Sequence, residues 1–468
     1  MARRRKKKQP SHRYGLPLDN APVPKHLKQI NLSAAGIDIG SRQHFVAVPE
    51  GRDEAVVRSF GTFTADLEAI ADWLKQCGIT TVAMESTGVY WIPMFELLEA
   101  RGFEVKLVQP AKLKNVPGRK TDVLDCQWIQ QLHTYGLLEG SFRPTDQICV
   151  LRSYLRQRDR LVHSAAQHIQ HMQKALMEMN VQLHHVINDI TGTTGLRIID
   201  AILGGERDPQ RLAELRHPNC KNDKKTIALG LQGNWRDDHL FALEQALALY
   251  RFYHQKLSEV DARVESYLAT FDDQSAARQL PAKTKKAKSS GKKKNNAPQF
   301  EVRPHLFRMT GVDLTSLDGI GDHIALQLIS EIGTDMNAWP TEKRFCSWLT
   351  LCPGNYRTGG KQHKSKTGTR TSSNRAAHLF RLAANSLWKA DCALGAYFRR
   401  MKARRGAPKA IVATAHKLAG LVYRMLKYGT TYVDYGSAWY EAQFRTKQVE
   451  GLRRRAQELG FSLTPESA

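Results

Sequence analysis

The feature that most restricts the fold of this chain is a series of short apolar segments between residues 33 and 145. Three segments of strand length come first, and helix, strand, helix and strand follow them. The segments read AAGIDIG, HFVAVPE, VVRSFGTF, ADLEAIADWLKQCG, TVAMES, WIPMFELLEARG and EVKLVQP. Because strands alternate with helices, this part of the chain is expected to form a mixed β-sheet covered by helices.

The order of these elements matches a ribonuclease H-like layout, so we expect a mixed-sheet domain of this type over residues 31–145. Beyond it the periodicity is helical throughout, first over residues 146–275 and later over residues 303–436. The fold class predicted for the whole chain is therefore α/β plus all-α.

Residues 146–275 have the pattern of long helices. Between Leu240 and Tyr267, apolar side chains recur at steps of three or four, which is typical of a coiled coil. Residues 147–180 predict a second long helix. We expect the two to pair as an antiparallel helical arm, within one chain or between two chains. Such a stripe is more typical of a helical core than of a cofactor site.

Three further segments complete the predicted organisation. Residues 276–302 are expected to be a linker, because the tract PAKTKKAKSSGKKKNNAP within them cannot bury a core. Residues 303–436 predict a compact helical domain, and residues 437–468 a peripheral helical tail. Residues 1–30 open with MARRRKKKQP and predict a disordered arm that contacts nucleic acid nonspecifically.

The charge balance points to a polyanionic partner. The 468 residues carry a formal net charge of +25, and neutralisation of phosphates with counterion release is the usual use of such an excess. The seven cysteines include no CxxC pair, which favours reduced, structural thiols in a cytosolic protein. No apolar run is long enough to span a bilayer, and no secretory signal is recognisable. A cytoplasmic location is therefore expected, with association with nucleic acid such as the nucleoid.

Four acidic residues of the first domain predict a metal site. Asp38 lies inside the apolar strand GIDIG, and Glu85 ends the strand TVAMES. Asp122 and Asp125 are three residues apart, so they share one face at the start of a helix. Hard oxygen ligands of this kind suit Mg²⁺ or Mn²⁺, and two such ions can hold a scissile phosphate.

The alternative is that these acids are ordinary surface and helix-capping charges, which is the better explanation for Asp125 taken alone. Arg119 and Lys120 precede the acidic pair and are candidates for contact with a phosphate backbone. A solvated surface charge explains either of them equally well.

Several motifs together resemble a known family. GIDIGSRQHFVAV, MESTGVYWIPMFELLEARGFEVKLVQP and GRKTDVLDCQWIQQL are similar to the RuvC-like DEDD domain of bridge-RNA-guided insertion-sequence transposases. LTSLDGIGDHIALQLISEIG, FCSWLTLCPGNYRTGGK, NRAAHLFRLAANSL and LGAYFRRMKARRGAPKAIVATAHKLAGLVYRMLKYG resemble that family's C-terminal transposase domain. The likeness is greater to its longer-chain subgroup, and it covers roughly residues 33–180 and 303–435.

The resemblance implies a site-specific recombinase that cuts and rejoins target and donor DNA at sites chosen by a structured guide RNA. It also implies that Asp38, Glu85, Asp122 and Asp125 hold the divalent metals. A serine of the C-terminal domain would attack the phosphate and form a covalent link to DNA. The family works as a tetramer, a dimer of dimers, with composite sites built from two chains.

The chain departs from the family at that serine, whose place in LCPGNYRTGG is taken by Thr358. Threonine keeps a hydroxyl for the same chemistry, but its methyl group restricts χ1 and crowds an in-line approach. Three interpretations stay open. Thr358 is a working nucleophile, or it is a slow or inactive substitution, or a nearby hydroxyl has taken over. The candidates for that last role are Ser365, Ser372 and Ser373.

The segment around Thr358 has the composition of a nucleic-acid contact. Between Glu342 and Asp391 there are ten Lys or Arg and no acidic residue. The glycines at 359 and 360 would let the backbone approach a phosphate closely. The candidate phosphate contacts are Gly359, Gly360, Lys361, Lys364, Lys366, Arg370 and Arg375. A solvated basic face is the alternative.

The function predicted from the sequence is that of an RNA-guided DNA recombinase that uses a side-chain hydroxyl and metal ions. Two other hypotheses stay open. One is a catalytically silent relative that binds guide RNA and DNA. The other is a metal-dependent RuvC-like junction resolvase in which water is the nucleophile.

Overall fold

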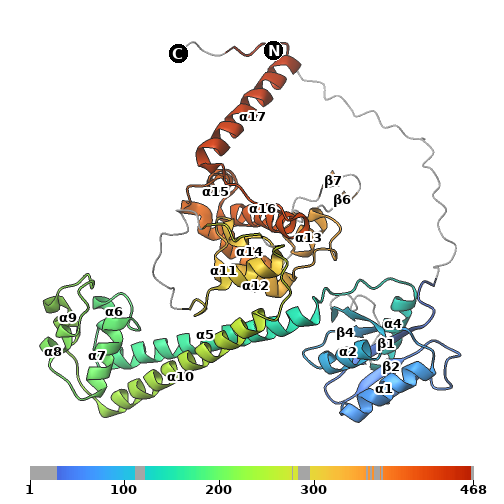
Figure 1. The fold of residues 1–468 in the computed structure, drawn as a ribbon, viewed down its shortest axis with the longest axis horizontal. Coiled ribbons are helices and arrows are strands. Elements are labelled where there is room, and N and C mark those ends of the chain that lie inside the picture. Colours follow the sequence, from blue (N-terminus) through green and yellow to red (C-terminus); the bar gives the residue numbers. More distant parts are fainter. Residues whose placement is uncertain are drawn as a thin grey trace, which may run out of the picture. The chain divides into compact units, whose positions relative to one another are not determined.

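The computed structural model describes residues 29–110, 122–276, 278–282, 296–354, 357–358, 361–362, 369 and 373–464 (Figure 1). The chain divides into two compact units, residues 1–143 and residues 144–468. Almost all of the predicted basic arm and most of the Lys-rich tract lie outside the described residues.

The first unit is built on a mixed sheet of five strands in the order β3-β2-β1-β4-β5. The strands are β1 (Ala34–Ile39), β2 (His44–Ala47), β3 (Val57–Phe60), β4 (Thr81–Glu85) and β5 (Glu104–Val108). The first three are joined antiparallel, whereas β1, β4 and β5 run parallel. The mixed sheet predicted from the sequence is therefore confirmed. The likeness to ribonuclease H stays a prediction.

Helices cover both faces of this sheet. Side chains of one face, such as Ile37 and Met84, share a core with α1 (Thr64–Gln76) and α2 (Trp91–Ala100). The opposite face includes Ala83 and Val108, which pack with Ile129 of α4 (Asp122–Thr134). Because successive residues of a strand point to opposite faces, Asp38 lies on the same face as Gly36, the face that α4 covers.

A glycine makes the close packing of α4 on β1 possible. A Cβ atom at Gly36 would lie 2.3 Å from the backbone nitrogen of Gln130 and 2.4 Å from the carbonyl oxygen of Cys126. Both atoms belong to the backbone of α4, so a flexible side chain cannot move aside to make room. Gly36 therefore fixes how near the helix comes to the central strand.

The second unit begins with two long helices, α5 (Asp146–Glu178) and α10 (Asp237–Leu268), which pack side by side along much of their length (Figure 1). We call this pair the arm. Four short helices between them share a core with the adjoining ends of the arm. They are α6 (Leu183–Val186), α7 (Thr193–Leu203), α8 (Pro209–Glu214) and α9 (Lys224–Gly230). The two long helices thus pack together within one chain, and their coiled-coil geometry stays a prediction.

A buried ion pair joins the two helices of the arm. The Arg158 guanidinium donates to both carboxylate oxygens of Asp261, at 2.6 and 3.2 Å, and each side chain is only 3% exposed. Arg158 also donates to the carbonyl of Asn296, and the N–H of Gln299 donates to Asp261. The last residues of the predicted linker are therefore held against the arm.

The rest of the second unit is a helical domain with one short hairpin. Its core forms where α16 packs against α13, α14 and α15, and it includes Phe345, Phe380 and Tyr423. The helices are α11 (Val302–Thr310), η2 (Leu314–Ser316), α12 (Asp322–Ile332), α13 (Glu342–Trp348), α14 (Arg375–Ser386), η4 (Leu387–Lys389), α15 (Ala393–Arg405), α16 (Ala407–Tyr428) and α17 (Gly436–Glu458). The hairpin consists of β6 (Arg357–Thr358) and β7 (Lys361–Gln362).

Within the described ranges, no helix combines the length and the apolarity that crossing a membrane requires.

Replacing Gly36 by Ala should push α4 away from β1 and lower the free energy of unfolding by about 3 kcal/mol, as overpacking does in a dense core. Urea unfolding measures the change. Gly451→Ala is the matched control, because a Cβ atom there meets no other atom within 4 Å and position 451 lies in α17. The control should be neutral or slightly stabilising. Equal stability of both variants would contradict the role assigned to Gly36.

Replacing Asp261 by Ala should lower the free energy of unfolding by about 3–5 kcal/mol, because it leaves Arg158 buried without its carboxylate partner. Asp200→Ala is the control. Asp200 of α7 pairs with Arg251 of α10, but both side chains are about half exposed, so that loss should stay below about 1 kcal/mol. A similar loss in both variants would show that the buried pair contributes no more to the free energy of unfolding than the exposed pair does.

Candidate active site

Two of the four predicted acids lie on neighbouring strands. In the parallel pairing of β1 with β4, Ile37 stands opposite Met84. Asp38 and Glu85 come next along their strands, so they lie at the same level of the sheet and on the face that α4 covers. The Thr87 hydroxyl donates to Glu85 Oε1 at 3.2 Å. The first domain therefore presents two carboxylates at the carboxyl ends of adjacent parallel strands.

The other two acids lie in the first turn of α4, as the sequence predicted. The next residue after Asp125 is Cys126, whose carbonyl lies over Gly36 of β1. Burial raises the pKa of the Cys126 thiol to about 12, and the negative charge of Asp38 adds to this shift. The start of α4 is thus close to Asp38 as well as to Gly36.

The pKa of Asp38 is influenced by the other three acids. Its pKa is raised from 3.8 to about 6; burial is the largest cause, and the charges of Glu85, Asp122 and Asp125 contribute to the same shift in that order of size. A hydrogen bond from the Ile39 N–H opposes the shift. The fold therefore brings four carboxylates from two strands and one helix close enough together for the other three to disfavour the charged form of Asp38.

The chemistry of this donor set fits a divalent cation. Its ligands would all be carboxylate oxygens, which Mg²⁺ and Mn²⁺ prefer, and a cation would offset the excess negative charge that the pKa of Asp38 registers. Among the described residues, no three His, Cys, Asp or Glu side chains already converge as ligands of one ion. The metal site stays a prediction that rests on the grouping of the acids.

Thr358 is the second residue of β6, in the short hairpin that β6 forms with β7. It pairs with Lys361 across the two strands, next to the pairing of Arg357 with Gln362. An isolated bridge between Pro353 and Thr369 adds a second antiparallel contact nearby. The sequence predicted only a basic loop in this region, because β6 and β7 are too short to carry a pattern.

The predicted phosphate contacts divide into two groups. Lys361 is in β7, and Arg375 is the first residue of α14. The others lie outside the described residues and stay predictions: Arg119, Lys120, Gly359, Gly360, Lys364, Lys366 and Arg370. Of the alternative hydroxyls, Ser373 is exposed, whereas Ser365 and Ser372 lie outside the described residues.

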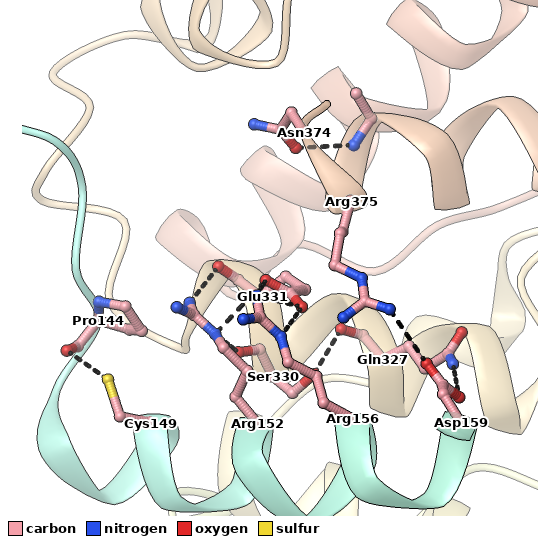
Figure 2. A network of polar contacts seen from close by, with 11 residues as sticks. Pro144, Cys149, Arg152, Arg156, Asp159, Gln327, Ser330, Glu331, Asn374 and Arg375 are labelled. Atoms are coloured by element: carbon pink, nitrogen blue, oxygen red, sulfur yellow. Dashed lines mark hydrogen bonds and ion pairs between the residues drawn. The ribbon is translucent and has the colours of Figure 1, made fainter. Parts of the chain in front are cut away.

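Arg375 belongs to a polar network that the sequence analysis missed (Figure 2). Its guanidinium lies 3.7 Å from the carboxylate of Asp159 on α5. Arg152 and Arg156 of the same helix bind Glu331 at the end of α12. The spacing of these three arm residues places them on one helical face, which is a readable signal. Glu331 lies more than 170 residues beyond the two arginines in the sequence, and Arg375 lies still farther from Asp159. No local sequence pattern therefore reveals these partners.

Comparison with known families matches two regions of the chain. Residues 35–181 match the DEDD transposase domain of the IS110 family, and residues 313–399 match a family described as Transposase IS116/IS110/IS902. The two regions together span half of the chain. The four acids fall in the first match, and Thr358 and Arg375 fall in the second. No curated protein matches the chain.

Asp38→Asn should stabilise the metal-free protein above about pH 6, because it removes a charge that the fold disfavours. The raised pKa means that the folded state binds this proton more tightly than the unfolded state does. The penalty is thus absent below pH 3.8 and complete above about pH 6. Since Asp38 is partly exposed, we expect a gain on the order of 1 kcal/mol in urea unfolding with EDTA at pH 7.5, and none at pH 3.5.

Addition of Mg²⁺ should raise the Tm of the wild-type protein and raise that of Asp38→Asn much less. Asp72→Asn is the control, because Asp72 is exposed on α1 beside Arg101. This control should respond to Mg²⁺ as the wild type does. Destabilisation of Asp38→Asn at pH 7.5 in EDTA, or an equal Mg²⁺ response in all three proteins, would contradict the grouping of charges around Asp38.

Proposed function

Because this chain belongs to the IS110 family of transposases, we propose that it is an RNA-guided, site-specific recombinase that moves an insertion sequence. A transposase of this family acts in DNA transposition and recombination. We further propose that a bridge RNA guides the protein and that a side-chain hydroxyl is its nucleophile. The observation that carries the metal-assisted part of the proposal is the grouping of four carboxylates around Asp38 in the DEDD domain.

The acids have a defined part in this proposal. Asp38, Glu85, Asp122 and Asp125 would hold two divalent ions, Mg²⁺ or Mn²⁺. When bound, such ions activate an attacking oxygen and stabilise a leaving one. The cost of charging Asp38 in the free protein supports this part, since functional sites are where a fold tolerates such repulsion.

Thr358 supplies the attacking oxygen in the proposed reaction. Its Oγ1 forms a bond to the phosphorus of a DNA phosphodiester as the bond from phosphorus to one DNA oxygen breaks. The hydroxyl proton is lost and the departing DNA end gains one. One ester replaces another, so the reverse attack by a DNA hydroxyl can rejoin the strand. The place of Thr358 within the second matched region supports this assignment.

The proposed partners are a structured guide RNA, target DNA and donor DNA, with the protein acting as a homo-tetramer. Base pairing of the guide would choose the sequence, and the protein would supply geometry and phosphate contacts. The net charge of +25 supports a partner of this kind. Since its proposed substrate is DNA, we also propose that the protein acts at the nucleoid.

A covalent trap tests the proposal. The full chain, a guide RNA transcribed from the noncoding flank of its own element, Mg²⁺ and DNA carrying the element ends are incubated and run on a denaturing gel. We expect a protein–DNA adduct that Thr358→Ala abolishes. Thr358→Ser should form it faster, by up to about tenfold, because the crowding methyl group is absent.

The other results of the trap separate the alternatives. Cleavage without an adduct, unchanged in Thr358→Ala, would point to a resolvase that uses water. An adduct that survives in Thr358→Ala would move the nucleophile to another hydroxyl, and Ser365→Ala, Ser372→Ala and Ser373→Ala would identify it. Binding of RNA and DNA without cleavage, restored to cleavage by Thr358→Ser, would identify a silent relative.

A further inference from the structure

Arg375 lies between the segment that contains Thr358 and the body of α14. It is the first residue of α14 and directly follows the hydroxyl-rich segment YRTGGKQHKSKTGTRTSSN. The preceding residue, Asn374, caps this helix, because its side-chain oxygen accepts from the N–H of Ala377 at 3.0 Å. The backbone at the end of the segment is therefore fixed, and the Arg375 side chain projects from that fixed point toward α5 (Figure 2).

The Arg375 guanidinium meets an acid of the arm. Its Nη2 lies 3.7 Å from Asp159 Oδ2, and the side chains are 49% and 25% exposed. Gln327 of α12 donates to the other oxygen of Asp159 at 2.9 Å. Asp159 is thus oriented by a neighbour and presents one oxygen to the arginine, as a phosphate oxygen would.

The rest of the network holds Asp159 in place. Arg152 donates to the carbonyls of Ser330 and Glu331, each at 2.9 Å, in the last turn of α12. A cation at these carbonyls complements the helix dipole. Arg156 donates to both carboxylate oxygens of Glu331, at 3.0 and 3.1 Å. The arm is therefore fastened to α12 independently of Asp159, and loss of the Arg375 contact would not release it.

Binding of Arg375 to a phosphate should be stronger than its ion pair with Asp159. A partly exposed ion pair contributes at most about 1 kcal/mol. An arginine can bind a phosphate through two parallel hydrogen bonds, which are stronger than a single contact at longer range. A DNA phosphate that reaches Arg375 can consequently displace the carboxylate of Asp159.

We propose that Arg375 is a binding site for a backbone phosphate of duplex DNA, and that Asp159 of the arm is a built-in competitor that occupies it in the free protein. This inference rests on the proposed function, since it takes DNA as the partner. It adds a role for the arm. The arm weakens DNA binding at the end of the Thr358 segment, and its grip on Arg375 is lost when DNA is bound.

A thermodynamic cycle tests this proposal. Binding of the full chain to a fluorescent 30-base-pair DNA of mixed sequence is measured by anisotropy at fixed KCl concentration. Asp159→Asn keeps the acceptor for Gln327 but removes the competing charge, so it should tighten binding about two- to fivefold. Arg375→Gln should weaken binding. In the Arg375→Gln background, Asp159→Asn should change the affinity by less than about 1.5-fold.

Asp200→Asn is the matched control. Like Asp159→Asn, it removes one negative charge from the second unit. The charge that it removes belongs to the exposed partner of Arg251. Its effect should be smaller than that of Asp159→Asn. Equal tightening by Asp200→Asn, persistence of the Asp159→Asn effect in the Arg375→Gln background, or an effect confined to a duplex RNA of equal length would each overturn the proposal.

The same measurements separate this inference from the proposed function. If the wild-type chain binds no DNA at low salt, this inference fails, whereas the proposed function fails only if the covalent trap with guide RNA shows neither an adduct nor cleavage. If it binds DNA, and Asp159→Asn leaves the affinity unchanged while the protein keeps its Tm, only the role of Asp159 fails. Tightening that depends on Arg375 supports the role of Asp159.

Discussion

The candidate site depends on the contact between the backbone of α4 and the backbone of β1 at Gly36. Only a residue without a Cβ atom lets the helix come so near, with helix backbone atoms 2.3–2.4 Å from where that atom would stand. This approach carries Asp122 and Asp125 to the end of the strand that holds Asp38. Burial of Asp38, with the neighbouring carboxylate charges adding to its effect, raises the pKa of Asp38 to about 6. Functional sites are where a fold tolerates such an unfavourable charge, and this supports a ligand that offsets it.

The second unit uses opposite charges where the first uses like charges. The buried pair of Arg158 and Asp261 joins the two helices of the arm and also holds the chain at Asn296 and Gln299. One face of α5 then fastens α12 through Arg152 and Arg156. The arm is thus more than a spacer, because its charged face also contacts Arg375, the residue that directly follows the Thr358 segment.

Local signals and long-range contacts differ in how far the sequence predicts them. Strand and helix alternation in the first unit, and the place of Asp38 within an apolar strand, were readable because side-chain period and burial are local properties. The register of β1 against β4 and the closeness of α4 depend on residues about 50 and 90 positions apart, so neither was predicted. Arg375 was predicted as a phosphate contact, but the partner that it has in the free protein, Asp159, belongs to another helix and was not foreseen.

The central claim is that Asp38, Glu85, Asp122 and Asp125 form one metal site. Anomalous diffraction from crystals of the full chain grown with Mn²⁺ tests it most directly. We predict a peak within about 2.5 Å of an Asp38 carboxylate oxygen and of at least one oxygen from the other three acids. Manganese peaks elsewhere on the protein and none at Asp38, at a pH above 7, would contradict the account.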